Sequence, residues 1–157
     1  MITQDSIVFH IKDKQKYVLV NFVYLNCPNV CHKVNNRLEE IYDSINHEII
    51  PSKLELVTVS FDMKNDNLQK IRNYRNHFGG DISGWSFALP FKIQQHEFDQ
   101  LLERIGIWMK AAPESTIINH SIYLFLVSPE NEIIKIFDPA RESNTEIITK
   151  LYSCLNH

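Results

Sequence analysis

Short apolar runs alternate along this chain with segments in which apolar residues recur every three or four positions. The runs span residues 17–25, 54–61 and 85–89. Runs of this length, rich in β-branched and aromatic residues, are typical of buried strands, and the segments after them are typical of helices with one apolar face. A strand that is followed by a helix and a further strand builds a parallel sheet, because the helix carries the chain back.

The C-terminal third of the chain changes this order. Residues 107–119 have the composition of a loop, and two strand-like segments at 121–127 and 132–137 then flank a turn in which Asn131 can take a positive φ. A last helix is expected over 143–155. We therefore predict an α/β chain with a thioredoxin-like fold, a mixed central sheet flanked by helices and a late β-hairpin.

Length and composition narrow the class of protein. The chain of 157 residues indicates a single domain over 1–157. Its net charge of -3 argues against a nucleic-acid partner, because duplex binders normally carry a basic excess. The run at 17–25 is far shorter than the ~18 residues of a spanning helix, and the first residues lack the basic and apolar regions of a signal peptide. We expect neither a membrane span nor a targeting signal in this chain.

The segment NCPNVCH at 26–32 carries the clearest chemistry. It places Cys27 and Cys31 where the first long strand ends and the first helix begins. Residues four apart at a helix start share a face, and helix N-terminal amides favour thiolates. Two such thiolates can form a disulfide or bind a soft metal, although the C-x-x-x-C spacing differs from the C-x-x-C of dithiol oxidoreductases. Two buried cysteines that act only as small apolar side chains are the alternative.

A soft metal held by two thiolates needs a further ligand. Among seven histidines, His120 is the best candidate, because it directly precedes the strand-like segment SIYLFLV and would lie near the first helix start in a thioredoxin-like sheet. Two thiolates and one imidazole suit Cu(I), and with an added ligand Cu(II) or Zn(II). The alternative is a surface or core histidine with no metal role.

Three segments then resemble the Sco/SenC family of copper chaperones, in the right order. KYVLVNFVYLNCPNVC resembles the family's G-K-x-x-L-x-x-F-x-Y-T-x-C-P-x-x-C-P segment, LELVTVSFDMKNDN resembles V-x-x-S-x-D-P-x-R-D, and NHSIYLFLVSPENEIIKIF resembles D-H-S-x-x-x-Y-L-x-x-P-x-G. The match covers about residues 17 to 137. The resemblance implies that Cys27, Cys31 and His120 are copper ligands for Cu(I) and Cu(II), and it aligns Asp62 with the family's acidic residue after the second strand.

Some residues depart from the family pattern. His32 stands where the family has Pro after the second cysteine, the D-P-x-R-D segment lacks its Pro and Arg, and Asn119 replaces an Asp before the ligand histidine. Family members usually carry an N-terminal membrane anchor, which is not expected in this chain. None of these departures removes a ligand.

The resemblance implies a metallochaperone that delivers copper to, or matures, the copper site of a respiratory cytochrome oxidase. Its partners would be the oxidase's copper-site subunit and another copper donor. Its location would be extracytoplasmic, at the periplasmic face of the inner membrane or in the mitochondrial intermembrane space. Copper would move by ligand exchange, with His120 leaving first on a mobile loop over 107–119.

The alternative function is a thiol–disulfide oxidoreductase that keeps the target's cysteines reduced. Cys27 would then be the attacking thiol and Cys31 the resolving one. A peroxidase that uses Cys27 is disfavoured, because no dedicated Arg lies next to that cysteine in the sequence.

Four other residues are weaker candidates for a role at the metal site. Asp62 either accepts a hydrogen bond from a ligand or is a solvated loop carboxylate. Met63 is expected to pack rather than bind metal, and Cys154 on the last helix is expected to be structural. His32 either adds an imidazole to the metal or is exposed on the first helical turn.

Overall fold

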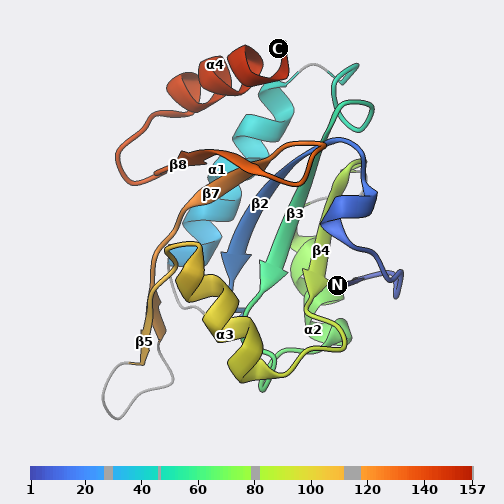
Figure 1. The fold of residues 1–157 in the computed structure, drawn as a ribbon, viewed down its shortest axis with the longest axis vertical. Coiled ribbons are helices and arrows are strands. Elements are labelled where there is room, and N and C mark those ends of the chain that lie inside the picture. Colours follow the sequence, from blue (N-terminus) through green and yellow to red (C-terminus); the bar gives the residue numbers. More distant parts are fainter. Residues whose placement is uncertain (27–29, 46, 79–81, 112–117, 157) are drawn as a thin grey trace.

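The computed structural model describes residues 1–26, 30–45, 47–78, 82–111 and 118–156, with the side chains of 30–32 and 111 excepted. Six strands form the main sheet, in the order β1-β4-β3-β2-β7-β8 (Figure 1). They are β1 (Ile2–Thr3), β2 (Tyr17–Val23), β3 (Leu54–Ser60), β4 (Trp85–Leu89), β7 (Leu124–Val127) and β8 (Ile133–Phe137). β2, β3 and β4 run parallel, whereas β1, β7 and β8 join antiparallel. The predicted mixed sheet with a late hairpin is confirmed.

Helices cover both faces of this sheet. They are α1 (Val30–Ser44), α2 (Leu68–Arg75), α3 (Gln95–Arg104) and α4 (Asn144–Leu155), with 3-10 turns η1 (Ile11–Asp13) and η2 (Asn76–Phe78). Side chains of α1, α2 and α4 share one buried cluster with Leu19, Leu56 and Leu126 of the sheet. Side chains of α3 share the other cluster with Val18, Val57 and Phe125. Neighbouring positions of β2, β3 and β7 therefore point to opposite helical layers, which explains why apolar residues occupy both faces of these strands.

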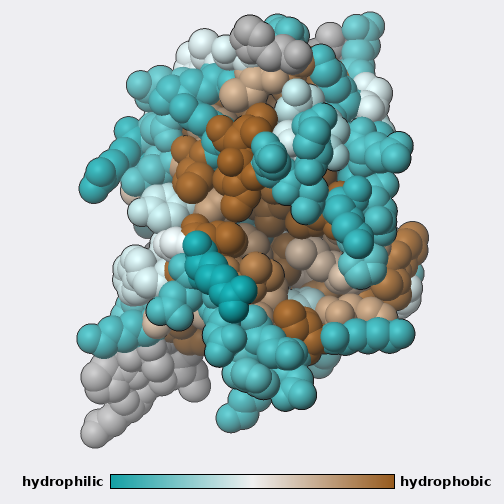
Figure 2. All heavy atoms as spheres, viewed as in Figure 1, coloured by the Kyte–Doolittle hydropathy of each residue, from teal (hydrophilic) through white to brown (hydrophobic). Residues whose placement is uncertain are grey.

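The face that carries α3 is only partly covered. A groove runs between the N-terminal segment, α3 and β7, and its lining includes Phe22, Leu101 and Ile133. Apolar side chains gather on this face of the molecule (Figure 2). No helix in the described part of the chain is long and apolar enough to cross a membrane.

Helix α2 is capped by Asn67, whose side chain accepts from the Lys70 amide. The structure corrects one local prediction. The segment 107–119 is not all loop, because β5 (Met109–Ala111) and β6 (Ile118–His120) pair antiparallel as a second sheet. Strands of three residues are too short to display an alternating pattern, and their pairing is decided by contacts that local sequence does not report.

A buried polar network holds α1 against the sheet. Asn35 of α1 accepts from Asn21 Nδ2 at 2.8 Å and donates to the Tyr74 hydroxyl at 2.8 Å. Thr58 donates to Asn21 Oδ1 at 2.7 Å and accepts from the Trp85 indole N–H at 3.0 Å. Because these bonds join α1, α2, β2, β3 and β4 within the core, they fix the rotation of α1 about its axis.

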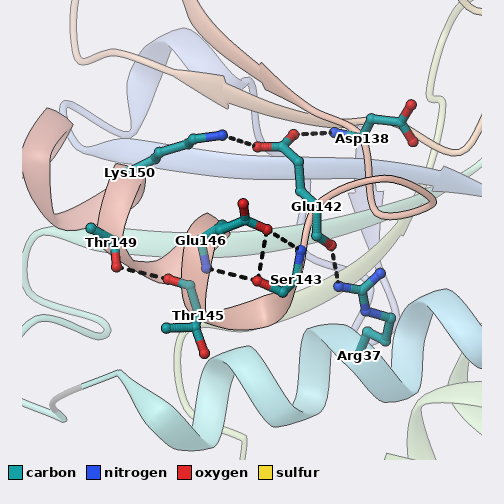
Figure 3. A network of polar contacts seen from close by, with 8 residues as sticks. All are labelled: Arg37, Asp138, Glu142, Ser143, Thr145, Glu146, Thr149 and Lys150. Carbon is teal, nitrogen blue, oxygen red and sulfur yellow. Dashed lines mark hydrogen bonds and ion pairs between the residues drawn. The ribbon is translucent and has the colours of Figure 1, made fainter.

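A second polar network joins the middle of α1 to the start of α4 (Figure 3). Arg37 donates to the backbone carbonyl of Glu142 at 2.7 Å. Ser143 caps α4 by accepting from the Glu146 amide, and the Glu146 carboxylate accepts from the Ser143 amide at 2.7 Å. The Glu142 carboxylate forms an ion pair with Lys150. This reciprocal capping box explains where the predicted last helix begins.

Candidate metal centre

Three chain segments meet at the carboxyl ends of the parallel strands. Tyr24 follows β2, Phe61 follows β3, and His120 ends β6. The His120 ring lies 4.9 Å from the Phe61 ring and 5.8 Å from the Tyr24 ring, measured between centroids, and both contacts are edge-on. The carboxyl edge of parallel strands is the usual position of a ligand site in an α/β sheet. The fold therefore brings His120 beside Tyr24, three residues before Cys27.

The protonation of His120 is set by its hydrogen bond to the backbone. Its Nδ1 lies 2.8 Å from the carbonyl oxygen of Ser121. A carbonyl oxygen only accepts, so Nδ1 carries the proton and the neutral ring keeps its lone pair on Nε2. Burial lowers the pKa of His120, and the bond to Ser121 opposes this only in part. The net lowering favours the neutral imidazole, which is the form that binds a metal.

The second sheet holds the strand that carries His120. His120 is the register partner of Met109, and the Trp108 amide donates to the Ser121 hydroxyl at 3.0 Å. The Ile118 amide donates to the Tyr24 hydroxyl at 3.2 Å, which ties β6 back to the end of β2. The position of His120 therefore depends on two short strands in a segment whose composition predicts a loop.

The structure describes the two cysteines of the predicted site to different extents. Cys27 lies outside the described residues. Cys31 is the second residue of α1, and its side chain, like that of His32, lies outside the description. Cys31 precedes Asn35 by one helical turn, so the two positions share the face of α1 that the polar network turns toward the sheet.

Asp62 is a buried carboxylate rather than a solvated one. It is 9% exposed and accepts hydrogen bonds from the Asn65 amide at 3.2 Å and from the Asn65 side chain at 2.9 and 3.0 Å. Within the described part of the chain, these bonds come from its own loop and not from His120. Asp62 adjoins Phe61, which contacts His120, so it lies one residue from the site wall.

Asp66 is a second buried carboxylate near this centre, and the sequence motifs did not single it out. This residue is 6% exposed, and its Oδ2 accepts from the Ser60 hydroxyl at 2.6 Å and from the Leu25 amide at 3.0 Å. Burial raises the pKa of Asp66, the negative charge of Asp62 adds to this, and the two hydrogen bonds oppose it. The signal was available, because Asp66 is the second acidic residue in the segment compared with D-P-x-R-D.

The weaker candidates fall outside this centre. Met63 packs against the core on the α3 face, as predicted, and its amide donates to the Gln95 side chain at 3.0 Å. Cys154 is a free cysteine that packs against the α1–α4 side of the core, as expected for a structural residue. Among residues whose side chains the structure describes, no group of three His, Cys, Asp or Glu side chains could hold a metal ion. A ligand set of three would have to include at least one side chain outside this description, as the predicted set with Cys27 and Cys31 does.

Comparison with known proteins agrees with the family resemblance of the sequence motifs. The family model described as SCO1/SenC matches residues 4–156. The mitochondrial SCO1 homologue of Homo sapiens is 23% identical over 126 residues, which are 78% of this chain and 40% of the human protein. The chain therefore spans well under two thirds of that relative's length.

Two solved structures share the fold. Arabidopsis thaliana ScoI with copper bound superimposes with a TM-score of 0.78 at 18% identity, covering 97% of this chain and 90% of that one. BsSco, described as a Sco-family cytochrome c oxidase assembly protein with a disulfide switch, also gives 0.78 at 18% identity, covering 99% of this chain and 90% of that one. Similarity at this identity establishes the fold.

Proposed function

The chain belongs to the SCO1/SenC family, and we propose that it is a copper metallochaperone that delivers copper to, or matures, the copper site of a respiratory cytochrome oxidase. The ligands are Cys27, Cys31 and His120. The observation that carries this proposal is the position of His120, a partly buried imidazole against Tyr24, which lies three residues before Cys27.

The chemistry of the three donors supports copper as the cargo. Thiolates are soft ligands that favour Cu(I), and an imidazole also suits Cu(II). Cys31 occupies the first turn of α1, where helix amides stabilise a thiolate. The Ser121 carbonyl orients the His120 ring and increases its basicity, as the outer hydrogen bond of a ligand histidine does. Asp62 contributes by shaping the loop after Phe61.

Delivery proceeds by stepwise ligand exchange. Thiolates of the receiving protein displace the ligands one at a time, and His120 leaves first because β6, which carries it, is a strand of three residues. The receiving partner is the copper-site subunit of the oxidase, and a separate copper donor loads the protein. The similarity to a copper-bound ScoI and to BsSco, a cytochrome c oxidase assembly protein, supports this role. An extracytoplasmic location is supported by the mitochondrial human relative.

Thiol–disulfide exchange is the second candidate function. A disulfide switch in the related BsSco favours it, since it indicates that cysteines of this family change redox state. Cys27 would attack a target disulfide, and Cys31 would resolve the mixed disulfide. Oxidation to a Cys27–Cys31 disulfide would consume both sulfur ligands, so the oxidised protein would bind no copper.

Anaerobic copper loading of the reduced protein tests the proposal. We expect one copper per chain with sulfur scatterers in the X-ray absorption spectrum. Cys27→Ser and Cys31→Ser should abolish tight binding, whereas Cys154→Ser should not. His120→Ala should retain some Cu(I) but lose most Cu(II) affinity and the thiolate-to-copper charge-transfer band. The matched control is His96→Ala, an exposed histidine of α3.

The same variants separate the two functions. Reduction of a disulfide needs no third ligand, so His120→Ala should still reduce one at a rate close to that of the unmodified protein. Unchanged Cu(II) binding in His120→Ala would show that the histidine is structural, and the oxidoreductase would then be the better assignment. Absence of sulfur scatterers around bound copper would refute the ligand set.

A further inference from the structure

Asp66 is joined to the chain that leads into the cysteine segment. Asp66 follows β3 in the sequence. Its Oδ2 accepts a hydrogen bond at 3.0 Å from the backbone N–H of Leu25, which lies 41 positions earlier. Leu25 stands two residues before Cys27. The same oxygen accepts from the Ser60 hydroxyl at 2.6 Å, and Ser60 is the last residue of β3. Asp66 therefore ties the exit of β2 to the exit of β3.

Several hydrogen bonds hold Asp66 in its position. Its amide donates to the Asp62 carbonyl at 2.9 Å, and the Ser60 hydroxyl that it accepts from is 2.6 Å away and in turn accepts from the Asp62 amide at 3.2 Å. Ser60, Asp62 and Asp66 are all buried. A carboxylate held from several sides has few rotamers open to it, so its bond to the Leu25 amide constrains the backbone there rather than following it.

Stability does not explain a carboxylate at this place. Oδ1 of Asp66 is buried and, within the described residues, has no hydrogen-bond partner. A buried polar atom without a partner costs stability, and such atoms are few in native proteins, so each one needs a reason. Burial also raises the pKa of Asp66, which shows that the folded environment disfavours its charge.

We propose that Asp66 is a positioning residue for the proposed copper site, because it holds the backbone at Leu25, which lies next to Tyr24 and two residues before Cys27 in the sequence. This proposal rests on the proposed copper site, and its geometric part stands independently of copper. Leu25 follows Tyr24, and the Tyr24 ring contacts His120, so the backbone fixed by Asp66 adjoins the wall of the site.

Two variants of Asp66 separate positioning from mere folding. Asp66→Ala removes both hydrogen bonds to the side chain. Asp66→Asn keeps a carbonyl oxygen that can accept from the Leu25 amide and the Ser60 hydroxyl, so it should rescue the geometry. Ser143→Ala, which removes the cap of α4 far from this loop, is the control for a loss of stability alone.

Amide hydrogen exchange at Leu25 measures the positioning without copper. In the reduced apoprotein we expect a protected Leu25 amide, at least tenfold faster exchange in Asp66→Ala, and exchange within about threefold of the unmodified protein in Asp66→Asn. Ser143→Ala should leave the Leu25 amide protected. Unchanged exchange in Asp66→Ala would overturn the proposal. If Asp66→Ala does not fold, Asp66→Asn decides the test, because it keeps an acceptor for the Leu25 amide. Loss of protection of the Leu25 amide in a folded Asp66→Asn protein would also overturn the proposal.

Copper loading tests the consequence for the site. Asp66→Ala should hold copper at least tenfold more weakly, with a shifted thiolate-to-copper charge-transfer band, and Asp66→Asn should restore both. Ser143→Ala should show the unmodified band. An unchanged band and affinity in folded Asp66→Ala would overturn the positioning role. An unmodified protein that binds no copper would instead refute the proposed function, and the exchange result would still decide whether Asp66 positions Leu25.

Discussion

Replacing Asn35 by Ala tests whether the buried polar network holds α1 in place. Asn35 is fully buried, with 0% exposed surface, and it makes two side-chain hydrogen bonds inside the core. The substitution removes the acceptor of Asn21 Nδ2 and the donor to the Tyr74 hydroxyl. A buried polar group that loses its partner costs about 1–3 kcal/mol, so we expect the free energy of unfolding to fall by about 2–5 kcal/mol.

Urea unfolding followed by circular dichroism measures this loss. For a domain of this length, about 3 kcal/mol lowers the melting temperature by roughly 6–12 °C, and the slope of the free energy against urea should stay unchanged. The control is Asn73→Ala, an exposed residue of α2, for which we expect a change within about 0.5 kcal/mol.

A double-mutant cycle makes the test specific. If Asn21 and Asn35 act through their 2.8 Å hydrogen bond, the loss in the double variant should be smaller than the sum of the two single losses. A loss below about 1 kcal/mol in Asn35→Ala, or strict additivity with Asn21→Ala, would refute the reasoning. The consequence for function is direct, because Asn35 follows Cys31 by one turn of α1.

Two further predictions concern titration and the α1–α4 contact. Burial lowers the pKa of His120 below 6.5, with the Ser121 carbonyl opposing, so its ring should titrate below pH 6.5 by NMR. The unfolded chain takes that proton first, so the free energy of unfolding should decrease as pH falls below about 6.5, and a His120 midpoint above 6.5 would contradict this. Arg37→Ala should lower the free energy of unfolding by about 1.5–3 kcal/mol, since its guanidinium donates to Glu142 and Asn144. Calorimetry should show little change for Arg141→Ala, whose side chain is 87% exposed, and equal effects of the two variants would contradict the role of Arg37.

Much of the fold could be predicted from local sequence. The strand expected over 85–89 has those same bounds in the structure, and Asn131 in the hairpin turn has the expected positive φ of 68°. Periodic apolar residues, turn residues and helix caps act over a few neighbours, so sequence reports them directly. The family resemblance came from the same local segments, and the match to SCO1/SenC over residues 4–156 confirms it.

The surroundings of the candidate site were decided by the tertiary structure. The bond from the Leu25 amide to Asp66 joins residues 41 apart, and the contact of His120 with Tyr24 joins residues almost a hundred apart. No local pattern encodes which backbone amide a buried carboxylate of a D-x-x-x-D segment accepts from, or which aromatic rings a histidine contacts. Those choices depend on burial and on hydrogen-bond partners that only the assembled sheet brings within reach.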